Sequence, residues 1–250
     1  MSLRCVNPFY AARRFRQAAS IRPAANDAAP IQKVVIGKAT LYRANCFDIL
    51  PTLNNIGAVV TDPPYCIGFS YRSYDDSPRR YHDLMTRLVP ECSRITGGGP
   101  CFVWQSPLKA DQWHRYFPKG YRIVAACKIF PDRPGKSNCL SWDPVIFWSR
   151  RTRLHDELSH DWHVDDLRPW DGYRGDNPVP CPRPLSQVRY FCEATSAESI
   201  LDPFLGSGTT GVAAVLAGKT FVGIEQDPLY FEYACKRIAK AANAAANVGN

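Results

Sequence analysis

The chain has 250 residues and a mass of 28.1 kDa, enough for one α/β domain with a sizeable core or for two small domains. Its 45% hydrophobic and 22% charged residues exclude a wholly disordered chain, and no apolar run approaches the roughly 20 residues that cross a bilayer, so we expect no membrane partner. Lys and Arg exceed Asp and Glu by 31 − 23 = 8, and 22 of the 31 basic residues are Arg. The planar guanidinium of Arg binds phosphates and stacks on bases, so the basic charge favours a nucleic-acid partner.

Residues 1–30 differ in composition from the rest of the chain. Five arginines precede the first acidic residue, Asp27, and Ala and Pro make up much of the remainder. The pattern is typical of a mitochondrial transit peptide, of a disordered basic arm that touches DNA phosphates, or of leader sequence upstream of a true start. We favour the last two, for a reason that the motifs below supply, and expect 1–30 to be disordered.

From residue 31 the sequence alternates between strand-like and helix-like segments. Apolar and β-branched runs predict strands at 34–36, 39–42, 58–61, 101–105, 121–130, 145–149, 199–201 and 220–224. Helical spacing predicts helices at 46–53, 81–95, 109–117, 187–193, 209–217 and 228 to about 242, the last with Asp227 as N-cap. Residues 150–177 break the alternation. Strands that alternate with helices predict an α/β fold with a doubly wound, mostly parallel sheet.

Residues 201–210 (Leu-Asp-Pro-Phe-Leu-Gly-Ser-Gly-Thr-Thr) place two glycines between a strand and a helix. Gly206 and Gly208 lack the Cβ atoms that would keep a ligand from the backbone, and the helix start offers unpaired N–H groups. No Lys-Ser or Lys-Thr follows the glycines, so the turn is not a P-loop and suits a nucleoside or an amino-acid group. Glu225 ends the next strand, 225 − 202 = 23 residues after Asp202, near the separation at which an acid binds the ribose hydroxyls. The alternative interpretation of the two glycines, taken without their neighbours, is a tight turn that binds no ligand.

A buried strand also leads into Asp62-Pro63-Pro64-Tyr65. Because proline fixes φ and has no N–H, the Pro63 carbonyl can face a ligand as an acceptor in a rigid turn, and Asp62 adds a second acceptor. Tyr65 supplies a flat face. Two acceptors beside a ring suit the exocyclic amino group of a planar base, with an ordinary Asp-Pro turn as the alternative.

Together the two motifs resemble those of the amino-group DNA methyltransferases, which use S-adenosylmethionine as cofactor. The resemblance covers about residues 38–240, and the catalytic motif precedes the cofactor motif by 202 − 62 = 140 residues, the order of the β group. It implies a Rossmann-like methyltransferase domain over 31–250, with 150–177 as a small target-recognition insertion. The family is widespread in bacteria, phages and mobile elements, which favours a cytoplasmic location in a bacterial or phage-infected cell over mitochondrial import.

The resemblance also implies roles for individual residues. The implied catalytic residues are Asp62, Pro63, Pro64 and Tyr65. The implied cofactor-binding residues are Asp202, Pro203, Phe204, Gly206, Gly208, Thr209, Thr210, Glu225, Arg183 and Pro184. The chain departs from the family pattern at three places: Ala44-Asn45 stands where Gly-Asp is usual, Arg183 stands where Lys is usual, and the recognition segment is short.

The implied reaction moves a methyl group from a sulfonium to an amino nitrogen. Hydrogen bonds to Asp62 and to the Pro63 carbonyl would localise the nitrogen lone pair, the Asp62 carboxylate would stabilise the positive charge, and Tyr65 would stack on a flipped base. In the family, Asp at the first motif position is commoner among adenine N6 enzymes, so we favour adenine N6 over cytosine N4. The rival hypotheses are a non-catalytic DNA-binding module of the same fold and methylation of RNA or protein.

Further residues after the catalytic motif suit phosphate binding. Tyr71, Arg72, Arg79 and Arg80 are predicted to contact DNA, with a solvated loop as the alternative. We predict no metal site, because His155, His160 and His163 match no standard ligand spacing and none of the ten cysteines forms a Cys-x-x-Cys pair. DNA is the expected partner, while a cognate restriction endonuclease, the recognition sequence and the oligomeric state stay open.

Overall fold

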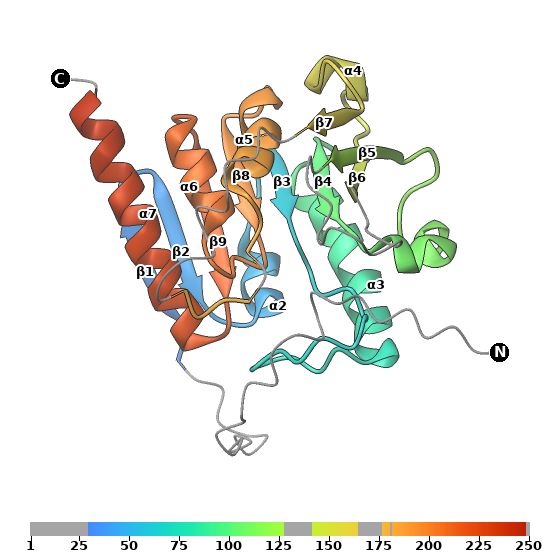
Figure 1. The fold of residues 1–250 in the computed structure, drawn as a ribbon, viewed down its shortest axis with the longest axis horizontal. Helices are drawn as coiled ribbons and strands as arrows, with labels where there is room; N and C mark the ends of the chain where they lie inside the picture. Colours follow the sequence, from blue (N-terminus) through green and yellow to red (C-terminus); the bar gives the residue numbers. More distant parts are fainter. Residues whose placement is uncertain (1–29, 128–141, 165–176, 181, 249–250) are drawn as a thin grey trace, which may run out of the picture.

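The computed structural model describes residues 30–127, 142–164, 177–180 and 182–248, which form one nine-stranded sheet with helices on both faces (Figure 1). The strands are β1 (Gln32–Ile36), β2 (Ala39–Arg43), β3 (Ala58–Thr61), β4 (Cys101–Trp104), β5 (Arg122–Cys127), β6 (Trp142–Trp148), β7 (Trp162–Val164), β8 (Ser199–Asp202) and β9 (Thr220–Glu225). Their order across the sheet is β1-β2-β9-β8-β3-β4-β6-β5-β7.

Parallel pairing holds the centre of this sheet. β2 pairs in parallel with β9, β9 with β8, β8 with β3, and β3 with β4. The antiparallel pairs, β1–β2, β4–β6 and β5–β6, lie to either side of that centre. The doubly wound α/β architecture predicted from the alternation is confirmed. Because parallel strands end at the same edge of a sheet, the carboxyl ends of β2, β9, β8 and β3 gather at one edge.

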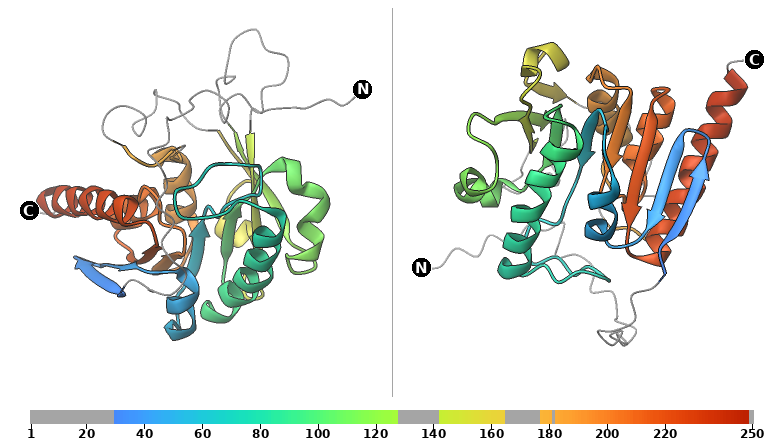
Figure 2. Two further views of the ribbon diagram at one scale, coloured as in Figure 1. Left: turned by 90° about the horizontal axis from the view of Figure 1, so that it is seen from below. Right: turned by 180° about the vertical axis from the view of Figure 1, so that it is seen from behind.

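Helices cover both faces of the sheet, as Figure 2 shows from two further sides. One face carries α5 (Leu185–Ala194), α6 (Thr209–Leu216) and α7 (Pro228–Val248). The other face carries α2 (Cys46–Ile49) and α3 (Pro78–Ile95). Two hydrophobic clusters fill the spaces between the layers. Every side chain of β3 and of β4 is buried, as expected for central strands that are covered on both faces.

Some segments differ from the sequence-based expectation. The segment Pro107–Arg115 is a 3-10 helix (η2), where helical spacing predicted a helix over 109–117. A second short 3-10 helix, η1 (Leu50–Thr52), completes the turn after α2. The predicted strand over 121–130 is described only as far as Cys127, because 128–141 lie outside the described residues.

The segment 150–177 is described in part. It contains α4 (Leu154–Glu157) and the edge strand β7, which pairs with β5. A three-residue strand is too short for its periodicity to be detected in a sequence. Glu157 is buried and accepts a hydrogen bond from the backbone N–H of Ser196 (3.0 Å), so this part of the segment is tied to the turn that precedes β8. The predicted insertion boundaries stay a prediction, since 165–176 lie outside the described residues, as do 1–29 of the N-terminal segment.

None of the helices in the described part of the chain combines the length and the hydropathy that a membrane span requires.

Gly211 lets α6 approach both α7 and the sheet. A Cβ atom at this position would lie 2.4 Å from Cδ1 of Ile238 on α7 and 2.8 Å from Cε1 of Phe221 on β9. Both distances are far below van der Waals contact. The close approach fixes the start of α6, and with it the glycine turn that precedes this helix.

We expect Gly211→Ala to lower the free energy of unfolding by about 1–3 kcal/mol through overpacking, even though alanine favours an isolated helix. Ile238→Val removes the Cδ1 atom that the new methyl group meets. In that background the added alanine should therefore cost less than it does in the wild type. Denaturant unfolding of the four proteins measures both effects, and an equal cost in the two backgrounds would contradict the assigned contact.

Candidate active site

The two sequence motifs lie side by side at the carboxyl edge of the sheet. β3 and β8 are parallel neighbours, with Ala58 opposite Ile200 and Val59 opposite Leu201. The Asp62-Pro63-Pro64-Tyr65 motif therefore begins beside the point where β8 enters residues 202–210. In Figure 1 β3 points towards the lower part of the molecule, and β8, its parallel neighbour, runs in the same direction. The topology thus brings together segments that are far apart in the sequence.

A buried hydrogen bond joins the two strand ends. Thr61 Oγ1 donates to Asp202 Oδ1 at 2.6 Å, and the same oxygen accepts from the backbone N–H of Phe204 at 3.0 Å. Asp202 is only 2% exposed, and burial raises its pKa to about 6. This carboxyl group therefore points into the protein, where it shapes the turn and ties it to the residue before Asp62.

The glycine turn leaves part of its backbone accessible. Gly208, at φ +78°, packs on α7: a Cβ atom there would lie 2.9 Å from Cβ of Ala234. Gly206, at φ +50°, has no atom nearer than 3.7 Å to such a Cβ position. Both glycines are required by their positive φ, and Gly208 by close packing as well. The turn residues that keep solvent exposure are Phe204 and Gly206, whereas Pro203, Thr209 and Thr210 are buried.

Glu225 supports the turn from the end of β9. Its Oε2 accepts the backbone N–H of Gly206 at 2.9 Å, and its Oε1 accepts the N–H of Asp227 at 2.8 Å. Burial raises the pKa of Glu225 to about 7 despite these hydrogen bonds. The side chain lies within reach of a ligand that rests on Gly206. Each carboxylate oxygen has two lone pairs, so it retains acceptor capacity for such a ligand.

Arg183 lies against the Asp62 carboxylate. Its Nε donates to Asp62 Oδ2 at 2.7 Å and its Nη2 approaches Asp62 Oδ1 at 3.3 Å. Nη2 also donates to the hydroxyl of Tyr65 at 2.5 Å, and Nη1 donates to Oδ2 of Asp143, at the start of β6. The guanidinium therefore bridges two carboxylates and the tyrosine of the predicted catalytic motif. Arg183 was predicted among the cofactor residues, and Asp143 was not singled out in the sequence.

The aromatic ring of the motif is covered. Tyr65 is 6% exposed, and Cζ of Arg183 lies 5.9 Å from its ring centroid. Pro63 and Pro64 are buried as well, whereas Asp62 keeps partial exposure. Protein atoms therefore cover most of the Tyr65 ring, and stacking of a base on this ring stays a prediction.

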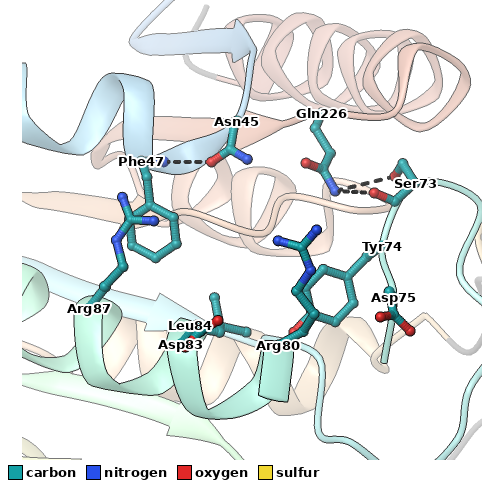
Figure 3. Close-up of a pocket in the computed structure, with 10 residues that line it drawn as sticks. All are labelled: Asn45, Phe47, Ser73, Tyr74, Asp75, Arg80, Asp83, Leu84, Arg87 and Gln226. Atoms are coloured by element: carbon teal, nitrogen blue, oxygen red, sulfur yellow. Dashed lines mark hydrogen bonds between the residues drawn. The ribbon is translucent and has the colours of Figure 1, made fainter. Parts of the chain in front are cut away.

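A pocket of 220 Å³ is lined by Gln226, the residue after Glu225 (Figure 3). The amide side chains of Asn45 and Gln226, which follow β2 and β9, face it from one side. Tyr74 and residues of α3 face it from the other side. Phe47 also lines the pocket, and the guanidinium of Arg87 stacks on its ring at 3.7 Å. A space with two amides and two rings suits a flat, polar heterocycle. Asn45 was noted in the sequence only as a departure from the family pattern.

The loop 66–77 runs from the catalytic motif to this pocket. At its base, the buried Asp76 accepts the backbone N–H groups of Cys66 at 2.7 Å, of Ile67 at 2.9 Å and of Phe69 at 3.0 Å. Towards its middle, Gln226 Nε2 donates to the carbonyl of Ser73 at 2.8 Å. The loop is therefore attached both to its own start and to the segment after β9.

The four residues predicted to bind DNA differ in their contacts. Arg72 forms an ion pair with Asp227 (Nε to Oδ2, 3.2 Å), although its side chain remains 62% exposed. Tyr71 packs against Phe69, with ring centroids 4.7 Å apart. Arg79 and Arg80 are exposed in the first turn of α3, and Arg80 also lines the pocket of Figure 3.

The histidines that were weighed as metal ligands lie apart from this site. His163, on β7, stacks on Tyr190 of α5 with ring centroids 4.3 Å apart. His160 packs against Trp162. Within the described ranges no group of three His, Cys, Asp or Glu side chains is arranged to hold a metal ion.

Comparison with known proteins identifies related chains. The N6/N4 family model, described as DNA methylase, matches residues 135–236. The type II methyltransferase M2.MboI of Moraxella bovis is 34% identical over an alignment 240 positions long, which spans 79% of this chain and 86% of that protein. The type II methyltransferase M2.DpnII of Streptococcus pneumoniae is 38% identical over an alignment 112 positions long, which spans 38% of this chain and 41% of that protein.

Solved structures share the fold. The complex of M1.HpyAVI with SAM has a TM-score of 0.60 at 19% identity, over 80% of this chain and 98% of that one. The PvuII DNA methyltransferase, which is described as cytosine-N4-specific, has a TM-score of 0.58 at 14% identity, over 85% of this chain and 94% of that one. The match to M2.MboI extends over most of both chains, and the family model agrees with it. The chain therefore belongs to the amino-group (N6/N4) DNA methyltransferases, which transfer a methyl group to the amino groups of DNA bases.

Proposed function

We propose that this chain methylates the exocyclic amino group of a base flipped out of DNA, with adenine N6 as the target and S-adenosylmethionine as the methyl donor. The observation that carries the proposal is the junction of β3 and β8, where Thr61 and Asp202 tie the start of the Asp62 motif to the glycine turn. Direct transfer requires the methyl donor and the accepting amino group to be aligned. A cofactor site at the glycine turn and a base site at Asp62, which share one strand junction, meet this requirement.

The residues around the glycine turn suit S-adenosylmethionine. The accessible Gly206 backbone lets a ligand approach, and Glu225 supplies acceptors for two ribose hydroxyls. The adjoining pocket, with the amides of Asn45 and Gln226, suits the adenine ring. The cofactor supplies an electrophilic methyl group on a positively charged sulfur. Asp202, Thr209 and Thr210 are buried, so we propose that they shape this site, and that the accessible Phe204 and Gly206 contact the ligand.

Asp62 is the proposed catalytic residue. An aromatic amino nitrogen is a weak nucleophile because its lone pair is delocalised into the ring. A hydrogen bond to the Asp62 carboxylate, with a second to the Pro63 carbonyl, would hold the nitrogen lone pair towards the methyl group. As the N–C bond forms and the S–C bond breaks, positive charge moves from sulfur to nitrogen, and the nearby carboxylate stabilises it. The nitrogen then loses one proton to water.

The adenine preference rests on the motif itself. Asp at its first position is commoner among the adenine N6 enzymes of the family, as the sequence resemblance implies. Cytosine N4 is the second candidate, and the fold shared with the cytosine-N4-specific PvuII enzyme keeps it open. The order of the two motifs leads us to propose membership of the β group.

Partners and organisation are further parts of the proposal. Because its relatives are type II methyltransferases, we propose that the chain modifies one specific DNA sequence in the cytoplasm of a bacterial or phage-infected cell, alongside a cognate endonuclease. We propose that 150–177 reads that sequence and that Arg79 and Arg80 bind phosphates near the flipped base. Arg72, which pairs with Asp227, is a weaker candidate for this role.

The nature of the methylated base can be measured directly. DNA from a methylation-free host that expresses the chain should contain N6-methyladenine after enzymatic digestion and mass spectrometry. N4-methylcytosine instead would overturn the adenine preference. Absence of both bases, with purified protein also inactive on DNA, would favour the rival in which the fold is kept for DNA binding alone.

Asp62→Ala is expected to lower kcat for methyl transfer by at least about a hundredfold, because the carboxylate acts on charge that develops in the transition state. The dissociation constant for S-adenosylmethionine should change little, since none of the proposed cofactor contacts, in the glycine turn, at the end of β9 and in the pocket, is Asp62. Single-turnover transfer of labelled methyl groups and calorimetric titration measure the two quantities. A variant with near-normal kcat would remove Asp62 from the mechanism.

Glu225 predicts a pH dependence of cofactor binding. Its pKa is raised to about 7, so Glu225 gains a proton as the pH falls through that value. The protonated group has less acceptor capacity for the ribose hydroxyls. Affinity for S-adenosylmethionine should therefore be highest above about pH 8 and should decrease by up to about tenfold per pH unit below about pH 6. Glu225→Gln should bind weakly at high pH and show a flatter profile. An unchanged profile in this variant would assign the titration to another group.

A further inference from the structure

Asp143 lies close to the proposed catalytic carboxylate, on an element that neither motif contains. It is the second residue of β6, and its carboxylate accepts a hydrogen bond from Nη1 of Arg183. The side chains of Asp143, Arg183 and Asp62 are 14%, 17% and 30% exposed. All three charges are therefore partly shielded from water, where the interactions between them are stronger than at an open surface.

The shape of the guanidinium makes this arrangement rigid. The edge formed by Nε and Nη2 of Arg183 faces both oxygens of Asp62, and the remaining nitrogen, Nη1, faces Asp143. A planar fork held on two sides cannot turn without breaking one of these contacts. Asp143 thus fixes the position of Arg183, and through it the orientation of the Asp62 carboxylate and the Tyr65 hydroxyl.

The charges give Asp143 a second effect. The positive guanidinium of Arg183 partly neutralises the Asp62 carboxylate. It also repels the positive charge that develops on the amino nitrogen during methyl transfer. Asp143 supplies a negative charge on the opposite side of the same guanidinium, which offsets part of this repulsion. Removal of the Asp143 charge should therefore weaken stabilisation of the transition state even when Arg183 stays in place.

We infer that Asp143 is a positioning residue for methyl transfer, which acts through Arg183 on the orientation and the effective charge of Asp62. This inference rests on the proposed catalytic role of Asp62. It assigns a role in the reaction to the start of β6, which lies outside both the Asp62 motif and the glycine turn. A purely structural ion pair is the alternative, and it would affect the stability of the fold without a specific effect on kcat.

Asp143→Asn tests this role, because the amide oxygen can still accept the hydrogen bond from Nη1 while the charge is lost. We expect kcat to fall at least about tenfold, with the dissociation constant for S-adenosylmethionine within about threefold of the wild type. In an Arg183→Gln background the same substitution should have little further effect, because the group through which Asp143 acts is gone. Equal effects in the two backgrounds, or an unchanged kcat in the single variant, would overturn the inference.

Two controls complete the design. Glu193→Gln removes one charge from the exposed Glu193–Arg189 pair of α5 and should leave kcat within about twofold. If Asp143→Asn does not fold, Asp143→Glu and Asp143→Gln form a second pair, equal in length and different in charge. Higher kcat for the glutamate variant supports the inference and equal values overturn it. Near-normal activity of Asp62→Ala would instead refute the proposed function, whereas an inactive Asp62→Ala with a normal Asp143→Asn would refute only the role of Asp143.

Discussion

The parallel pairing of β3 with β8 determines where the proposed chemistry takes place. The Asp62 motif and the glycine turn lie far apart in the sequence, and each is an ordinary strand-to-loop junction when considered alone. Because the strands are neighbours and point the same way, their carboxyl ends coincide, and the Thr61–Asp202 hydrogen bond fixes the two junctions relative to each other. The other side chains of the site, from Glu225 to Arg183, are arranged around that junction.

This junction carries an electrostatic cost. Two carboxyl groups on neighbouring strand ends, Asp202 and Glu225, have raised pKa values because Asp202 is buried and Glu225 is largely removed from water. Their charged forms destabilise the fold relative to the unfolded chain as the pH rises through these values, since the unfolded chain ionises more readily. Backbone N–H groups of Phe204, Gly206 and Asp227 offset part of this cost. The site is thus built from groups that a purely stability-driven sequence would not bury together.

Local sequence patterns were sufficient to predict the central strands, the glycine turn and the residues at the strand ends. Buried apolar runs such as β3 and capped helices such as α7 depend on neighbouring residues alone. Asp143 could not be found in this way, because its role depends on Arg183, which approaches it only after β6 and the segment before α5 have packed. The inward direction of Asp202 and the burial of Tyr65 were also beyond the sequence, which names the residues of a motif without the direction of each side chain.

The loop 66–77 is attached at its base and in its outer part. Asp76, which is buried, holds the base of the loop through three backbone N–H groups. The outer part is attached to the segment after β9 by the ion pair of the exposed Arg72 with the buried Asp227, and by hydrogen bonds from the Gln226 amide to the carbonyl and hydroxyl of Ser73. The pocket wall formed by Tyr74 is therefore positioned from two directions, by the catalytic motif through Asp76 and by the segment after β9 through Gln226.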